Sequence, residues 1–152
     1  MTVPPNQRMQ PESDSEDPAL RAAWFAEQRA LAERYLRGQQ VLFGSIEPEP
    51  AWFVAPVVAF WRALGVRSGA PVYWVITGDL PSDFLPCDAA PTPRAAAAAF
   101  AERWRIVAGY LSEGKEHPTI HVGAAQDRAG LAPMLRRRAD ILHEWAAEDE
   151  HW

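Results

Sequence analysis

The sequence predicts an α+β fold in which an antiparallel β-hairpin, with or without a short third strand, packs against three α-helices. Two apolar runs rich in β-branched and aromatic residues follow one another in the middle of the chain. Three other segments repeat apolar residues at helical spacing, and two of them open on a capping residue followed by proline. A two-stranded hairpin is only marginally stable alone, so the helices must cover it.

The chain divides into a tail, residues 1–17, and a single α+β domain, residues 18–152. The tail carries three prolines, four acidic residues and one arginine, and almost nothing apolar. Such a segment cannot offset its ordering entropy by burial, so we expect it to be disordered. One arginine against four acidic residues gives the tail −3 of the chain's net charge of −5.

The first helix is expected over residues 18–39. Asp17 is suited to the N-cap, Pro18 to the first helical position, and Gly38 to the end. The apolar residues expected on its inward face, with Glu27 or Gln28 filling the missing turn, are Leu20, Trp24, Leu31 and Tyr35.

The hairpin is predicted from the runs at residues 51–61 and 71–77, with a loop at residues 65–70. Both alternating sets of residues in the first run are apolar, which indicates a strand buried on both faces. Pro56 cannot donate to a ladder, so the strand begins after it, lies at an edge, or bulges there. A short helix over residues 56–64 is the competing interpretation.

Two more helices are expected after the hairpin. Thr92 and Pro93 repeat the cap-and-proline signal, and Gly114 ends the second helix. Residues 115–130 are expected to be irregular, with a brief strand at residues 119–122 as an alternative. The third helix is predicted over residues 131–148. Its acidic C-terminal end is expected to fray because negative charge is unfavourable there, and the alternative is that cations from elsewhere, including a partner's basic surface, approach it.

Composition and charge exclude several classes of protein. The net charge of −5 argues against binding to nucleic acid or to anionic membranes. The single cysteine, Cys87, allows no internal disulfide and no cysteine-rich zinc site. The N-terminus lacks a secretory pattern, and the longest apolar run is too short for a bilayer, so we expect a cytoplasmic protein. We also expect no cofactor.

The loop at residues 78–88 carries the strongest candidates for chemistry. Asp79 and Asp83 follow a predicted strand, and a functional interpretation makes them an acid/base pair or a Mg²⁺ site. Arg94, Arg103 or Arg105 of the second helix would then hold an anion. The structural interpretation is stronger, because Gly, Pro, Ser and Asp are turn residues and no further motif completes a site.

Other candidates are weaker. Trp52 and Trp152 flank the predicted elements and are expected to be exposed, which makes them candidates for a contact surface. Cys87 has no identifiable base beside it, so a packed, inert thiol is expected. His117 and His121 would be ~13 Å apart on a strand, and Pro118 between them argues against a helix, so no metal site is predicted.

The stretch Tyr73-Trp-Val-Ile-Thr-Gly-Asp-Leu-Pro-Ser-Asp-Phe84 resembles the hallmark of a bacterial family catalogued as domain of unknown function 4826. The Pro56-Val-Val-Ala-Phe-Trp run, residues 100–105 and the terminal Trp152 are also similar. The resemblance covers most of the chain after residue 18, and the tail and residues 115–130 depart from it. It implies a fold grouping but no activity, cofactor or catalytic residue.

Two functional hypotheses follow. The first is a small interaction or regulatory protein, inhibitor-like, that contacts a basic protein partner through its acidic surface. The second is a small-ligand binder or hydrolase-type enzyme that uses Asp79 and Asp83 with an arginine of the second helix. The sequence leaves the oligomeric state open.

Overall fold

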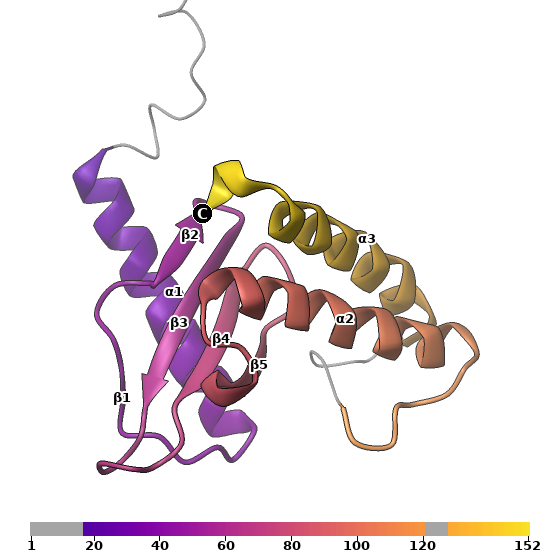
Figure 1. Ribbon diagram of the computed structural model, residues 1–152, viewed down its shortest axis with the longest axis horizontal. Helices are drawn as coiled ribbons and strands as arrows, with labels where there is room; N and C mark the ends of the chain where they lie inside the picture. The colour runs from indigo at the N-terminus through magenta and orange to yellow at the C-terminus, as the bar shows by residue number, and fades with distance from the viewer. Residues whose placement is uncertain (1–16, 121–127) are drawn as a thin grey trace, which may run out of the picture.

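The protein has three layers, with a β-sheet in the middle, one helix on one face and two helices on the other (Figure 1). The computed structural model describes residues 17–120 and 128–152. The predicted tail therefore lies outside the described residues except for its last residue, Asp17. The described elements confirm the α+β class and the three helices.

Helix α1 (Pro18–Gly38) begins where the sequence predicts and ends one residue before the predicted end. Its N-cap is Asp17, whose carboxylate accepts a hydrogen bond from the Ala19 amide at 2.9 Å. Leu20 was expected to face inward but is 54% exposed. Contact with the sheet begins at Arg21, whose guanidinium lies 5.7 Å from the ring centroid of Phe53, and continues at Trp24, whose ring centroid is 6.1 Å from that of Phe53. The buried residues of the helix face are Gln28, Ala32 and Leu36.

Strands β3 (Val58–Leu64) and β4 (Tyr73–Gly78) form the predicted antiparallel hairpin. Because β3 begins after Pro56, the alternative of a helix over residues 56–64 is wrong. Successive β3 residues point to opposite faces, and both sets are buried: Phe60 lies in the cluster under α2 and α3, whereas Trp61 lies in the cluster under α1. The prediction of a strand buried on both faces is confirmed.

The sheet is larger than a hairpin. It contains five antiparallel strands in the order β1-β3-β4-β5, and β2 pairs with the other half of β3. The additional strands are β1 (Ser45–Ile46), β2 (Trp52–Val54) and β5 (Asp83–Pro86). The expected loop over residues 78–88 therefore contains a strand. Residues 119 and 120 are irregular, and residues 121 and 122 of the alternative third strand lie outside the described residues.

Helices α2 (Pro93–Ser112) and α3 (Arg128–Ala147) cover the face of the sheet opposite α1. Thr92 caps α2 as predicted, accepting a hydrogen bond from the Ala95 amide at 3.1 Å. Helix α3 begins three residues earlier than predicted, so Pro133 lies inside it. Short 3₁₀ turns, η2 (Cys87–Ala89) and η3 (Asp149–His151), follow β5 and α3.

Candidate functional site

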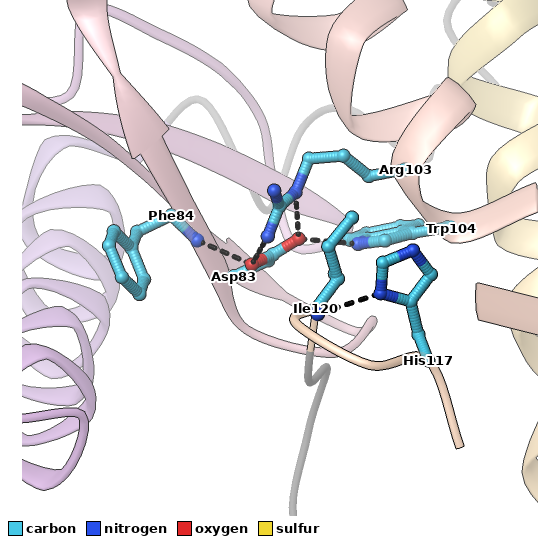
Figure 2. Close-up of polar contacts among 6 residues, drawn as sticks. All are labelled: Asp83, Phe84, Arg103, Trp104, His117 and Ile120. Atoms are coloured by element: carbon cyan, nitrogen blue, oxygen red, sulfur yellow. Dashed lines mark hydrogen bonds and ion pairs between the residues drawn. The ribbon is translucent and has the colours of Figure 1, made fainter. Parts of the chain in front are cut away.

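Asp83, at the start of β5, is the centre of a buried polar cluster that joins the sheet to α2 (Figure 2). It pairs with Ile76 of β4 and faces the side of the sheet that α2 and α3 cover. Arg103 donates to both oxygens, from Nε to Oδ2 at 3.1 Å and from Nη2 to Oδ1 at 3.2 Å. Trp104 Nε1 donates to Oδ2 at 3.0 Å, and the Phe84 amide donates to Oδ1 at 2.8 Å.

These contacts leave Asp83 without a free oxygen for a substrate. Its side chain is 0% exposed, whereas that of Arg103 is 28% exposed. Burial raises the pKa of the Asp83 carboxyl, although the Arg103 guanidinium and the hydrogen bonds from Phe84 and Trp104 favour the ionised form. Of the three arginines that the sequence offered as anion clamps, Arg103 reaches the carboxylate and neutralises it within the fold.

Tyr35 of α1 brings a second buried polar group to this edge of the sheet. Its ring packs against Phe84 at 6.2 Å between centroids, and its hydroxyl is buried without a hydrogen-bond partner among the described residues. Burial raises the pKa of Tyr35, and the negative charge of Asp83 raises it further. The hydroxyl therefore stays neutral at physiological pH.

The loop after α2 folds back toward the same cluster. His117 Nδ1 accepts hydrogen bonds from the amides of Thr119 at 3.1 Å and Ile120 at 2.9 Å. Ile120 packs against the core cluster that contains Trp104, and Figure 2 shows its side chain in front of the Asp83 ion pair. The hydrogen bonds of His117 fix the shape of this loop, and Ile120 attaches it to the core.

Asp79 occupies a different environment from Asp83. Gly78 ends β4 with φ of +131°, and a Cβ there would lie 2.2 Å from the Val57 carbonyl oxygen. The Asp79 amide donates to that same oxygen at 2.8 Å, which fixes the backbone. The Asp79 side chain is 79% exposed, and its Oδ2 lies 3.6 Å from Nη2 of Arg138 on α3. That separation is too long for a hydrogen bond.

An open depression of about 460 Å³ lies beside Asp79, between the end of β4 and the first half of α3. Its walls are formed by Gly78, Asp79, Leu80, Pro81, Leu131, Met134 and Arg138. The three α3 residues share one helix face, being three and seven positions apart. Arg138 is 33% exposed, and its Nε is buried without an acceptor in the described part of the chain.

The stretch that suggested a family resemblance supplies both environments, because it contains β4, Asp79 and Asp83. A family model described as Domain of unknown function (DUF4826) matches residues 18–152. The chain belongs to this family. No curated protein and no solved structure matches the chain. The DUF4826 match begins at the first residue of α1 and includes every described helix and strand.

Two of the predicted arginine clamps of the DUF4826 protein join α2 to the C-terminal helix. Arg94 donates from Nε to the Ala146 carbonyl at 2.7 Å and pairs with Asp149 at 2.9 Å. Arg105 pairs with Asp140 at 3.0 Å. The acidic end of α3 thus has the approaching cation that was the alternative to fraying, because Arg94 contacts both the Ala146 carbonyl and Asp149.

The two candidate contact tryptophans contact each other. Trp52 and Trp152 stack with 4.4 Å between ring centroids, and both are half-buried rather than exposed. Trp52 Nε1 donates to the His151 carbonyl at 2.6 Å, and Trp152 Nε1 donates to the Trp145 carbonyl at 2.8 Å. The chain's last residues are thereby fixed on β2 and α3. Their role in binding a partner stays a prediction.

The remaining candidates have limited chemistry. Burial raises the pKa of the half-buried Cys87 thiol, while Arg62 acts in the opposite direction, so little thiolate forms at neutral pH. His121 lies outside the described residues, so the His117–His121 prediction stays untested. Among the described residues, the potential metal ligands that cluster are Glu148, Glu150 and His151, which offers no support for Mg²⁺ at Asp79 and Asp83.

Sequence reasoning missed Arg138, Leu131 and Met134 as partners of the loop at residues 78–88. Arg138 belongs to the run 136–138, whose members point in different directions around the helix. The helical spacing of the three residues was available in the sequence. The sequence did not show that this face of α3 lies next to Asp79, because that position depends on how α3 packs.

No helix in the described part of the chain is long and apolar enough to cross a membrane.

Proposed function

We propose that the protein is a small cytoplasmic protein-binding module with a regulatory, inhibitor-like role that acts by contact and not by catalysis. The observation that carries this proposal is the separation of the two loop carboxylates. Asp83 is buried and fully paired with donors of the fold, whereas Asp79 is exposed beside an open depression. A general acid–base pair needs two groups that reach the same reacting atoms, and these two have different partners.

The charge of the chain favours a basic partner. The net charge is −5, and several cations of the described part are neutralised by internal ion pairs, including Arg94, Arg103 and Arg105. Glu148, Asp149 and Glu150 are exposed at the C-terminal end. Complementary charge of this kind steers association and disfavours acidic partners.

A small-ligand binder is the second candidate, because the depression next to Asp79 combines charged and apolar groups. A hydrolase has less support. Asp83 has no free oxygen to activate water, and Asp79 has a neighbouring cation but no second carboxylate among its described contacts.

Site-specific photo-cross-linking in native cells tests the proposed function. A photo-reactive amino acid at position 79 reports on the depression, and one at the exposed position 34 on α1 is the matched control. We expect one protein to cross-link at position 79 and not at position 34. The purified partner should then form a complex of fixed stoichiometry in analytical ultracentrifugation, weakened by salt. Equal labelling from both positions, or no complex on reconstitution, would contradict the proposal.

A further inference from the structure

The depression beside Asp79 contains a guanidinium, that of Arg138, whose donors make no hydrogen bond among the described residues, next to apolar side chains. We infer that it binds the C-terminal residue of a partner polypeptide, with the terminal carboxylate on Arg138 and an apolar last side chain on the apolar wall. This inference rests on the proposed protein-binding function and names what is recognised.

Arg138 has the capacity to bind a carboxylate. A guanidinium offers five N–H donors in one plane and binds carboxylates through pairs of parallel hydrogen bonds. Asp79 leaves that capacity unused, since its oxygen is 3.6 Å from Nη2. The Asp79 side chain is largely solvated, and an exposed ion pair of this kind holds its partner weakly. A carboxylate that makes two short hydrogen bonds to the terminal nitrogens therefore competes well for Arg138.

The wall of the depression suits an apolar side chain. Leu80 and Pro81 line one side, and Leu131 and Met134 line the other. Methionine is unbranched and flexible, so it adapts to side chains of different shape. A site that encloses a small molecule buries most of its surface, whereas this depression is open. An open site suits the end of a chain whose preceding residues continue across the protein surface.

Asp79 distinguishes a polypeptide C-terminus from a simple organic acid. The last residue of a polypeptide carries a backbone N–H close to its carboxylate. When the terminal carboxylate is bound to Arg138, that N–H lies within reach of Asp79, because Arg138 Nη2 and Asp79 Oδ2 are 3.6 Å apart. The negative charge of Asp79 repels a bare carboxylate. When the ligand is a peptide, the Asp79 carboxylate accepts a hydrogen bond from that N–H.

Two alternatives in the same molecule lack these features. A depression of about 440 Å³ lies between α1 and residues 48–49, but its Arg29 already pairs with Glu33 and donates to the carbonyls of Ile46 and Glu47. The Trp152 side chain is held by Trp52 and Trp145, so a second copy of the chain does not offer that indole to the apolar wall.

NMR titration of the full chain with three probes tests the inference. N-acetyl-leucine carries the carboxylate, the N–H and the apolar side chain; N-acetyl-leucinamide lacks the carboxylate; 4-methylpentanoate lacks the N–H. We expect N-acetyl-leucine to shift the Nε–H resonance of Arg138 and the methyl resonances of Leu131 and Met134 saturably. The amide should bind at least about tenfold more weakly, and 4-methylpentanoate should fall between them.

Two variants on the same helix complete the test. Arg138→Gln should abolish the saturable shifts, whereas Arg137→Gln, at an exposed neighbouring position, should preserve them. Unchanged backbone spectra of both variants show that the fold is retained. Equal binding of acid and amide, or unchanged binding by Arg138→Gln, overturns the inference. If 4-methylpentanoate binds as tightly as N-acetyl-leucine, recognition of a polypeptide end is overturned. A reconstituted partner complex that survives Arg138→Gln would leave the proposed function standing and remove only this inference.

Discussion

Asp83 shows how one residue decides between a catalytic and a structural role. Four donors from β5 and α2 converge on its two oxygens. A buried ion pair is expensive to desolvate and gives little net stability over an apolar pair, but removing one partner leaves the other charge without compensation. The cluster therefore fixes α2 in one position on the sheet and makes it sensitive to single substitutions.

We predict that Asp83→Asn lowers the free energy of unfolding by about 3 kcal/mol, because Arg103 loses its counterion in a mostly buried position. Urea unfolding followed by tryptophan fluorescence measures the change. The double variant Asp83→Asn, Arg103→Gln should recover part of the loss, since no uncompensated charge remains. A double variant as unstable as the single one would contradict this explanation.

Tyr35 provides a prediction with a defined pH dependence. Its pKa is raised in the folded protein above the ordinary value of 10.0, so between that value and the folded pKa the native state keeps a proton that the unfolded chain loses. The free energy of unfolding therefore falls as pH rises above about 10, by at most about 1.4 kcal/mol per pH unit from this group.

Tyr35→Phe should remove that part of the alkaline loss. At neutral pH the variant should match the wild type within about 0.5 kcal/mol, because the hydroxyl removed has no hydrogen-bond partner among the described residues. Urea unfolding of both proteins at about pH 8 and about pH 11 tests the prediction. Parallel pH profiles would show that Tyr35 ionises alike in the folded and unfolded states.

At the scale of elements, β5 is an edge strand with few free donors. Cys87 donates to the Val72 carbonyl, so by strand alternation Leu85 and Asp83 also direct their amides toward β4. The outward positions are Phe84, whose amide is taken by Asp83 Oδ1, and Pro86, which has no amide hydrogen. The edge thus offers little to another strand, which is how sheets avoid edge-to-edge pairing.

The junction between β4 and Asp79 depends on Gly78. A Cβ at this position would lie 2.2 Å from the Val57 carbonyl oxygen, and φ is +131°. We predict that Gly78→Ala costs at least about 3 kcal/mol of unfolding free energy through steric overlap and strain. Gly109→Ala in α2 is the matched control, because its Cβ would meet nothing within 4 Å. It should stabilise the protein by about 0.5–1 kcal/mol, from helix propensity. Thermal unfolding of both variants tests the contrast.

The elements that could be predicted are those with strong local signals. Asp17 and Thr92 cap their helices as expected, and the runs of apolar residues in β3 and β4 indicate strands without tertiary information. Strand β2 (Trp52–Val54) falls within the apolar run 51–61 that predicted a single strand, and a turn at residues 55–57 separates it from β3. Strands β1 and β5 have only two and four residues, and their sequences include serine, aspartate or proline. They exist because neighbouring strands pair with them, and a single sequence carries little record of such pairing.

The candidate site follows the same division. The sequence pointed to Asp79, Asp83 and an arginine of the second helix, and the structure brings Asp83 and Arg103 together. The sequence could not show that the contact between Asp83 and Arg103 is buried, or that hydrogen bonds occupy both oxygens of Asp83. Nor could it show that Asp79 faces Arg138, because those residues are far apart in the chain and meet through the packing of α3.

At the scale of the molecule, the aromatic residues explain how a small chain fills two core layers. Trp104 and Phe100 fill the cluster under α2 and α3, and Trp61 fills the one under α1. Large rings bury much apolar surface per residue, which suits a sheet covered on both faces. An aromatic-rich composition therefore reflects packing more than an exposed binding surface.

The domain boundary gives the last prediction. The family match and α1 both begin at residue 18, and the sequence predicts that the preceding residues add no buried surface. Removal of residues 1–14 should therefore leave the free energy of unfolding unchanged within about 0.5 kcal/mol. Asp17 and two residues before it are retained in this variant, so the helix cap stays intact. Asp17→Ala in the full chain is the comparison and should cost about 1 kcal/mol. Urea unfolding of the two variants separates the cap from the tail, and a loss on truncation comparable to that of Asp17→Ala would place part of the tail within the folded domain.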